Sequence, residues 1–251
     1  MRGLKDKVAI VTGGGQGIGR ALTLRLAEEG CKVAIFDLKP EAAKETEGLA
    51  PKGSVTSYEL DVGDYAAVAA AVAKVEADLG PIWALVNNAG WDRPAPFLTT
   101  DKALWDKIVR INLYGPLNTH HVVAPLMVKR GGGRIINIAS DAARVGTSNE
   151  AVYSACKGGI ISFSKTLARE LARHRVTVNV ICPGPTDTPL LRGMVAAGNQ
   201  KLVDALTRAI PFGRLAAPHE IAAAVAFFAS PDADFITGQV LSVSGGLTMV
   251  G

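Results

Sequence analysis

The chain has 251 residues, of which 48% are apolar, 20% charged and 6% aromatic, a composition typical of a soluble globular protein. A chain of this length buries about 70–75% of its unfolded surface, and its three scattered cysteines argue against a disulfide framework and for a reducing compartment. The net charge of +4 comes from scattered basic residues, so we expect no nucleic-acid partner.

Apolar, β-branched runs alternate with helical stretches along the chain. The predicted strands are residues 8–11, 32–36, 55–60, 82–86, 134–138, 176–181 and 239–243. Predicted helices begin at Gly17, Pro40, Tyr65 and about Asp101, and another spans about residues 153–173. Strands at helix-sized intervals require right-handed crossovers in a parallel sheet. We therefore predict an α/β, single-domain Rossmann fold, with a seven-stranded parallel sheet and helices on both faces.

No linker or low-complexity tract divides residues 1–251, which predicts one dinucleotide-binding and catalytic domain. Residues 184–218 lack a clear strand, and an insertion of this kind predicts a functional segment such as a lid. The longest apolar run, residues 221–229, is too short for the roughly 20 residues of a membrane helix. The first residues lack the apolar centre of a signal peptide. We expect a cytoplasmic protein without membrane contact.

A glycine-rich stretch follows the first predicted strand and precedes a helix. Residues 12–19 read Thr-Gly-Gly-Gly-Gln-Gly-Ile-Gly. Such glycines let the backbone approach a pyrophosphate, while N–H groups of the next helix face the anion. The spacing does not match G-x-G-x-x-G, and Arg20 and Ala21 replace the Lys and Ser/Thr of a P-loop. The stretch predicts a dinucleotide site; a plain glycine-rich turn is the alternative.

Asp37 closes the second predicted strand, 18 residues after Gly19. A dinucleotide-binding fold places at this point the acid that binds the adenosine ribose. A 2′-phosphate nearby would be repelled by up to about 4 kcal/mol per unit charge at an effective dielectric near 20. We therefore expect NAD to be preferred over NADP, with Lys39 able to weaken the preference.

Tyr153 and Lys157 are four residues apart, which places them on one helical face. A nearby ammonium stabilises a phenolate and lowers the tyrosine pKa from its usual value near ~10, toward that of a general base. The alternative is an exposed helical pair.

Five ordered motifs together resemble the short-chain dehydrogenase/reductase family over essentially the whole chain. They are residues 12–19, the Asn87-Asn88-Ala89-Gly90 sequence, Ser140 thirteen residues before Tyr153, the Tyr153-x-x-x-Lys157 pair, and Pro183-Gly184. The resemblance implies a catalytic tetrad of Asn112, Ser140, Tyr153 and Lys157. In it, Tyr153 removes the proton from a substrate alcohol, and Ser140 hydrogen-bonds the same oxygen. Lys157 lowers the Tyr153 pKa and binds the nicotinamide ribose, and Asn112 holds a kinked helix around a proton-relay water.

The same resemblance implies the residues that bind the cofactor. They are Gly13, Gly15, Gln16, Gly17, Ile18, Gly19, Asp37, Leu38, Asp61, Val62, Asn88, Ala89, Gly90, Tyr153, Lys157, Pro183, Gly184, Thr186 and Thr188. Within this set Asp61 and Val62 contact the adenine, and residues 88–90 form the floor beneath the cofactor. Thr186 departs from the Val or Ile usual in the family, and little change is expected because that contact is made by the backbone.

No metal site is expected. His120 and His121 are adjacent on a helix and point about 100° apart, so they cannot share one metal. Cys156 has no histidine nearby in the sequence and is interpreted as a small buried residue.

The substrate prediction depends on four further segments. Trp91-Asp92, residues 140–146, residues 182–188 and residues 244–249 together resemble the 2-hydroxycyclohexanecarboxyl-CoA dehydrogenases of alicyclic and aromatic acid breakdown. We expect NAD-dependent interconversion of a cyclic or bulky secondary alcohol and its ketone. Trp91, Val145, Leu190 and Leu191 are candidates for an apolar pocket, and Arg144 or Arg192 for contacts with CoA phosphates; ordinary surface arginines are the alternative.

Other functions stay open. The alternatives are a free cycloalkanol or 1-arylethanol dehydrogenase, a 3-oxoacyl-thioester reductase, and a non-catalytic NAD(H)-binding sensor. The family resemblance also implies a homotetramer, and residues 221–229 and the last strand are apolar enough to lie between subunits.

Overall fold

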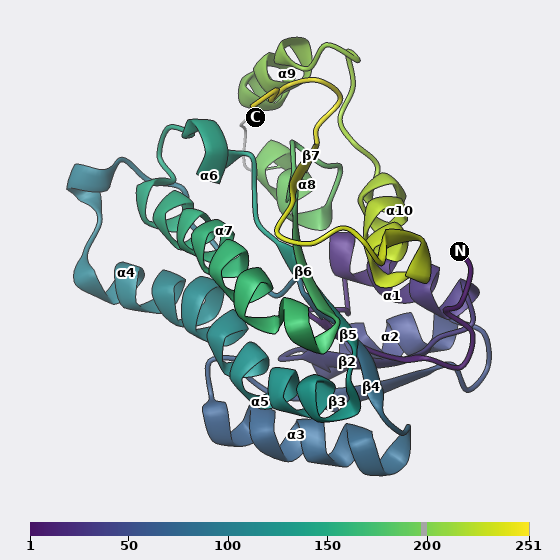
Figure 1. Cartoon of the computed structure of the whole chain (residues 1–251). Coiled ribbons are helices and arrows are strands. Elements are labelled where there is room, and N and C mark those ends of the chain that lie inside the picture. The colour runs from purple at the N-terminus through teal and green to yellow at the C-terminus, as the bar shows by residue number, and fades with distance from the viewer. Residues whose placement is uncertain (197–199, 251) are drawn as a thin grey trace.

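The computed structural model describes residues 1–196 and 200–250, and its centre is one parallel sheet (Figure 1). The strands are β1 (Val8–Thr12), β2 (Lys32–Asp37), β3 (Val55–Glu59), β4 (Ile82–Asn87), β5 (Gly133–Ile138), β6 (Val176–Pro183) and β7 (Val240–Val243). They lie in the order β3-β2-β1-β4-β5-β6-β7. The predicted seven-stranded Rossmann fold is confirmed.

Helices connect the strands on both sides of the sheet. They are α1 (Gly17–Glu28), α2 (Pro40–Leu49), α3 (Tyr65–Asp78), α4 (Lys102–Val109), α5 (Gly115–Arg130), α6 (Ala142–Val145), α7 (Ala151–Leu171), α8 (Pro189–Ala196), α9 (Gln200–Ala209) and α10 (Pro218–Ala229). Short 3-10 turns occur at Phe97–Thr99, Ala172–His174 and Pro231–Ala233, and a π-helical turn, η2 (Arg110–Tyr114), joins α4 to α5.

Alternate residues of each buried strand face two separate cores. In β1, Ala9 and Val11 pack with α1, α2 and α10, whereas Val8 and Ile10 pack with α3, α5 and α7. The period-two alternation of strand side chains produces this division, and burial on both faces explains why the strands are apolar throughout. Figure 1 shows the same arrangement, with α1 and α10 on one side of the sheet and α3, α5 and α7 on the other.

Nearby residues cap three of the helix ends. The carboxylates of Asp64 and Asp101 accept the N–H groups of Ala67 and Leu104 at 3.0 and 2.8 Å, so each caps the first turn of its helix. Asp101 therefore precedes α4 and does not begin it. Gly131 ends α5 with a φ of 74°, a left-handed conformation that favours glycine.

The apolar run at residues 221–229 lies inside this chain. Ile221, Val225 and Phe228 of α10 are buried in the core shared with α1. One side of this run therefore packs into the chain's own core, whereas Ala223, Ala224 and Phe227 are only half-buried, and a subunit contact at this run stays a prediction. By contrast, β7 is an edge strand, and Leu241 within it is exposed.

The insertion at residues 184–218 contains α8 and α9 and begins and ends at one point. Thr186 and Ala216 form a parallel bridge, in which Asp187 N–H donates to the Ala216 carbonyl at 2.9 Å and Ala216 N–H to the Pro185 carbonyl at 3.0 Å. Residues 197–199 of this insertion lie outside the described residues.

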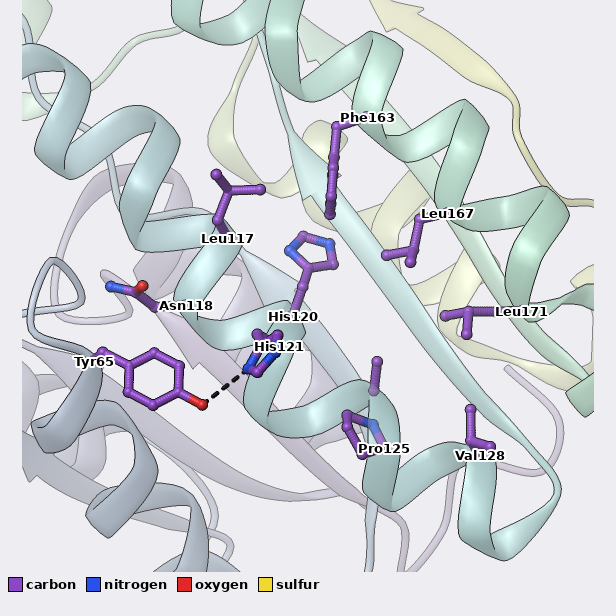
Figure 2. Close-up of a pocket in the computed structure, with 11 residues that line it drawn as sticks. Tyr65, Leu117, Asn118, His120, His121, Pro125, Val128, Phe163, Leu167 and Leu171 are labelled. Carbon is purple, nitrogen blue, oxygen red and sulfur yellow. Dashed lines mark hydrogen bonds between the residues drawn. The ribbon is translucent and has the colours of Figure 1, made fainter.

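A hollow of about 590 Å³ lies between α5 and α7 (Figure 2). Leu117, Phe163 and Leu167 are among its mostly apolar lining, and Tyr65 Oη lies 2.9 Å from His121 Nδ1 at its edge. The predicted catalytic residues are not part of this lining, so the hollow is separate from the site described next. No helix in the described ranges 1–196 and 200–250 is both long and apolar enough to span a membrane.

Candidate active site

Glycines in and after the loop between β1 and α1 allow close contacts between backbone atoms. Gly13 has a φ of 65°, and a Cβ there would lie 2.9 Å from the Cα of Ala89. A Cβ on Gly19 would lie only 1.9 Å from the Gly13 carbonyl oxygen. Gln16 is the N-cap of α1 and makes no side-chain cap bond, which leaves the first-turn N–H groups directed at the loop. The predicted strand–loop–helix context is therefore present.

Asp37 lies beside this loop at the end of β2. Its Oδ2 accepts the Gly15 N–H at 2.9 Å and its Oδ1 accepts the Lys39 N–H at 2.9 Å. Each carboxylate oxygen has a second lone pair, so the group can still accept from a ribose hydroxyl. Leu38, next to it, is 63% exposed and presents its side chain at the surface.

Asp61 and Val62 follow β3 and lie at the same end of the sheet. Asp61 pairs with Arg110 at 2.9 Å and accepts the Gly63 N–H at 2.7 Å. Val62 is buried, and its carbonyl accepts Asn118 Nδ2 at 2.9 Å. No sequence pattern predicts the role of Arg110, because its partner Asp61 is distant in the chain.

The Asn87–Gly90 sequence is joined to the end of β1 by polar contacts. The hydroxyl of Thr12 accepts the N–H groups of Asn88 and Ala89, both at 3.0 Å. Asn88 Nδ2 donates to the carbonyls of Thr12 and Gly13 at 3.0 and 3.1 Å. These contacts join the glycine loop to the predicted cofactor floor. The Thr12 hydroxyl makes two of them, a role that the sequence motif did not predict.

Asn112 lies fully buried in the π-helical turn η2. Its Nδ2 donates to the carbonyls of Trp91 and Ile108 at 2.6 and 2.9 Å, and its Oδ1 accepts the Trp91 N–H at 3.2 Å. A Cβ on Gly90 would lie 3.0 Å from Asn112 Oδ1 and 3.5 Å from Lys157 Nζ. The helix irregularity thus brings Asn112 and Lys157 to the same glycine, as expected for the family tetrad.

Ser140, Tyr153 and Lys157 converge at the carboxyl ends of β5 and β6. The buried Lys157 Nζ donates to the Ile138 carbonyl at 2.8 Å and lies 5.6 Å from the centre of the Tyr153 ring. Ser140 Oγ accepts the Ala142 N–H at 3.1 Å, and a hydrogen bond from Ser140 acts to lower the Tyr153 pKa. The three predicted side chains therefore meet.

The pKa of Tyr153 differs from the sequence expectation. Burial raises the pKa, and the nearby carboxylates Glu150 and Asp92 raise it further, while the Ser140 hydrogen bond opposes them. Burial also lowers the pKa of Lys157 to about 8, which weakens this lysine as a permanent cation. The predicted lowering of the Tyr153 pKa is therefore wrong for the protein's own side chains, which favour the protonated phenol.

The residues after β6 close the other side of the site. Gly184 lies against Ser244, where a Cβ would be 2.7 Å from that residue's own Cβ, and Thr186 donates its hydroxyl to the Gly184 carbonyl at 2.9 Å. Thr188 faces the glycine loop, because a Cβ on Gly17 would lie 3.5 Å from its methyl group.

These features together fit a dinucleotide cofactor. Gly13, Gly17 and Gly90 leave a bare strip of backbone between the α1 N-terminus and Lys157. Free N–H groups at a helix N-terminus suit a pyrophosphate, and Asp37 at the end of β2 suits a ribose. The loop from Pro183 to Thr188 lies opposite, where the remaining predicted contacts are found.

The predicted ring pocket is not enclosed. Trp91 packs in a cluster with Leu104 and Cys156, and Lys107 Nζ lies 3.8 Å from the centre of its ring. Val145 and Leu190 are 60% and 63% exposed, and Leu191 is half-buried. These side chains therefore do not form a closed surface around a ring.

Both arginines predicted for CoA phosphates have partners within the chain. Arg144 donates to Ser242 Oγ at 2.9 Å and to the Val250 carbonyl, and Ser242 donates to Asp141. Arg192 forms a two-point ion pair with Asp187 at 2.8 and 2.9 Å. The Arg144 contacts tie the loop after Ser140 to β7, which indicates a structural role.

The remaining candidates take ordinary places. Cys156 is buried, and burial raises the pKa of its thiol, as expected for an unreactive residue. His120 is buried, and desolvation lowers its pKa to about 4, whereas His121 is exposed. In the part of the chain that the structure describes, no group of three or more His, Cys, Asp or Glu residues could hold a metal ion.

Asp92 and Glu150 lie beside Tyr153, although the sequence predicts no role at the catalytic site for either and Asp92 entered only the substrate prediction. Both line a small hollow together with Tyr153. Glu150 lies three residues before Tyr153, and this spacing is a signal that could have predicted their proximity. Asp92 comes from the distant loop after β4, so no local spacing relates it to Tyr153.

Comparisons with known proteins agree with this geometry. The profile of the family described as Enoyl-(Acyl carrier protein) reductase matches residues 13–248. Nodulation protein G of Azospirillum brasilense is 43% identical over 249 residues, which cover 97% of this chain and 99% of that protein. Acetoacetyl-CoA reductase of Shinella zoogloeoides is 42% identical over 242 residues, covering 96% and 98%. A variant of actinorhodin polyketide ketoreductase, solved with NADPH, superposes with a TM-score of 0.92 at 34% identity, covering 98% and 99%.

Proposed function

The chain belongs to the short-chain dehydrogenase/reductase family, and from that premise we propose that it is a ketoreductase that reduces 3-oxoacyl thioesters with a nicotinamide cofactor. These relatives are named as reductases, so the enzyme class that they share is that of the oxidoreductases. What we propose is the direction of the reaction, the class of substrate and the preferred cofactor.

The meeting of Ser140, Tyr153 and Lys157 beside the bare backbone of Gly90 is the observation that carries the proposal. Burial and two carboxylates raise the phenol pKa, so the hydroxyl keeps its proton at neutral pH. A protonated phenol is a general acid, which reduction of a ketone needs, whereas oxidation of an alcohol needs a base at the same position. The raised pKa of Tyr153 agrees with its role as the acid in carbonyl reduction, and the direction of the reaction is supported by relatives that are named as reductases.

We assign the residues of the tetrad to steps at the substrate oxygen. Tyr153 donates its proton to the ketone oxygen, and the Ser140 hydroxyl hydrogen-bonds the same oxygen as negative charge develops there. Lys157, held by the Ile138 carbonyl, returns a proton to Tyr153, and Asn112 holds the π-helical turn in place beside Gly90 and Lys157. The nicotinamide cofactor, when bound, supplies the hydride.

The substrate class comes from the comparisons. A relative that covers nearly the whole chain is named for an acyl-CoA thioester, and the matching family profile for an acyl-carrier-protein thioester. These names favour the 3-oxoacyl-thioester alternative over the cyclic alcohol of our leading expectation, including 2-hydroxycyclohexanecarboxyl-CoA. The exposed positions of Val145 and Leu190 also give no support to a ring pocket.

We propose NAD(H) as the preferred cofactor because Asp37 fixes a negative charge where a 2′-phosphate would lie. The similar ketoreductase structure contains NADPH, so the choice needs a direct measurement.

Steady-state kinetics tests these proposals. We expect kcat/KM for acetoacetyl-CoA to exceed that for cyclohexanone and acetophenone, and NADH to be preferred over NADPH. Reduction of the simple ketones without reduction of acetoacetyl-CoA would contradict the thioester proposal. Binding of NADH with no turnover of any of these ketones would instead support the non-catalytic sensor.

We also propose that the protein is a cytoplasmic homotetramer. The apolar hollow between α5 and α7 is a candidate contact surface in addition to residues 221–229 and the edge strand β7. Light scattering at micromolar concentration tests the assembly, and a monomer there would refute it.

A further inference from the structure

Two carboxylates that the proposed mechanism does not use lie beside Tyr153. Asp92 comes from the loop after β4, and Glu150 immediately precedes α7. Both line the same hollow as Tyr153, at the junction of this loop, α4 and the start of α7. Residues distant in sequence therefore place two acidic groups next to the proposed proton donor.

The groups around Asp92 and Glu150 do little to neutralise the negative charges of these two side chains. The hollow is also lined by the apolar side chains of Phe97, Leu104, Trp105, Ile108 and Val152. Asp92 Oδ2 is buried and has no hydrogen-bond partner within the described ranges. Glu150 occupies the N-cap position of α7, but its side chain does not cap that helix.

No cation offsets these charges in the described residues. Arg93 lines the hollow, and Lys107 lies on the Trp91 ring nearby, yet neither forms an ion pair with Asp92 or Glu150. Burial raises the pKa of both carboxyl groups, that of Glu150 to about 7, and Asp92 raises it further. Only the Arg93 backbone N–H acts in the opposite direction, on Asp92.

We propose that Asp92 and Glu150 are specificity-determining residues that reject an acyl group carrying a negative charge and so restrict the site to neutral 3-oxoacyl derivatives. The inference rests on the proposed function. A thioester is neutral at its reacting end, whereas the free 3-oxo acid carries a carboxylate two carbons from the ketone. With Tyr153 at the ketone, that carboxylate would approach the hollow that Asp92 and Glu150 line together with Tyr153, where repulsion between like charges in poorly solvated surroundings is strong.

An isosteric pair of small substrates isolates the charge. Acetoacetamide and acetoacetate have nearly the same shape, but only the second is an anion at pH 8. We would measure kcat/KM for both with NADH, and their dissociation constants from the NADH-bound protein, for the wild type, Glu150→Gln and Asp92→Asn. Glu170→Gln is the matched control, because it removes an exposed carboxylate from the same helix.

The wild type is expected to favour acetoacetamide in both measurements. Glu150→Gln should raise the acetoacetate-to-acetoacetamide ratio about tenfold to hundredfold, Asp92→Asn should raise it at least severalfold, and Glu170→Gln should leave it within twofold. An unchanged ratio in both Glu150→Gln and Asp92→Asn would overturn the inference.

The two readouts separate this inference from the proposed function. Turnover of acetoacetyl-CoA with an unchanged ratio contradicts only the role of the carboxylates. If no 3-oxo compound is reduced, the proposed function fails, and the ratio of dissociation constants still decides whether the pair excludes anions.

Discussion

The nucleotide edge and the acyl side of the site treat negative charge differently. At the nucleotide edge, formed by the ends of β1, β2 and β4, Asp37 has a backbone N–H on each carboxylate oxygen. At the acyl side, formed by the loop after β4 and the start of α7, Asp92 keeps a buried oxygen without a partner in the described residues. The nucleotide edge is thus complete before any ligand binds, whereas the acyl side retains an unfavourable arrangement that serves selection rather than stability.

The largest expected effect tests the proton donor that lies between the two regions. Tyr153→Phe removes the hydroxyl and should lower kcat about 10²–10⁴-fold, the range for a general acid. Because the variant removes only one of many expected cofactor contacts and leaves the nucleotide edge intact, the NADH dissociation constant, measured by fluorescence titration, should change less than about threefold. Retained activity would contradict the assignment of Tyr153, and lost NADH binding would contradict the separation of the two regions.

The second prediction tests the packing of the nucleotide edge. Gly19→Ala introduces a Cβ 1.9 Å from the Gly13 carbonyl oxygen, so the loop must move. We expect NADH affinity to fall at least about 100-fold, with a loss of roughly 1–3 kcal/mol in the free energy of unfolding.

Gly48→Ala is the matched control for this variant, because a Cβ at Gly48 in α2 meets nothing within 4 Å. It should stabilise the helix by about 0.5–1 kcal/mol and leave NADH binding unchanged. Equal NADH affinity in the two variants would show that the loop tolerates a side chain.

The third prediction concerns the charge at the nucleotide edge. Asp37→Asn keeps the size of the side chain but removes the negative charge, and with it the repulsion of a 2′-phosphate. The ratio of kcat/KM for NADPH to that for NADH should rise about tenfold to thirtyfold. An unchanged ratio, measured at constant ionic strength, would leave Asp37 without a role in cofactor choice.

The smallest expected effect concerns stability against pH on the acyl side. The folded-state pKa of Glu150, about 7, lies above its ordinary value of 4.5, so the folded chain binds the extra proton between these pH values. The stabilising effect of that proton is complete below pH 4.5 and is lost as the pH rises through 7. Glu150→Gln should therefore gain about 1–2 kcal/mol relative to the wild type between pH 4.5 and pH 8, after allowance for solvent screening of a partly exposed group.

Urea denaturation at the two pH values measures this gain. Asp37→Asn is the opposite comparison, since it should lose about 0.5–1.5 kcal/mol at pH 8 by giving up hydrogen bonds to backbone N–H groups. If Asp37→Asn were more stable than the wild type, or Glu150→Gln less stable, the result would contradict the conclusion that negative charge is stabilised at the nucleotide edge and destabilising at the acyl side.

The fold and the nucleotide edge could be predicted because their causes are local. The alternation of strands and helices determines the sheet, and the glycines at 13, 17 and 19 report where backbone must stay bare. The N-cap aspartates at 64 and 101 likewise act on groups three residues away.

The acyl side could not be predicted in the same way. The Tyr153 pKa depends on Asp92, which is 61 positions distant, and on burial that no local pattern specifies. Arg144 and Arg192 were interpreted from their charge alone, but their partners Ser242 and Asp187 occupy them. Apolar composition alone likewise does not show that most of the run at residues 221–229 packs into the chain's own core.

The bridge between Thr186 and Ala216 also has a consequence for protein engineering. Because both ends of the insertion meet beside the sheet, the residues between them can differ in length without moving β6 or α10. The insertion is thus a replaceable unit, and transplanting residues 189–214 from a relative would exchange α8 and α9 while the sheet and its glycine loop stay as they are.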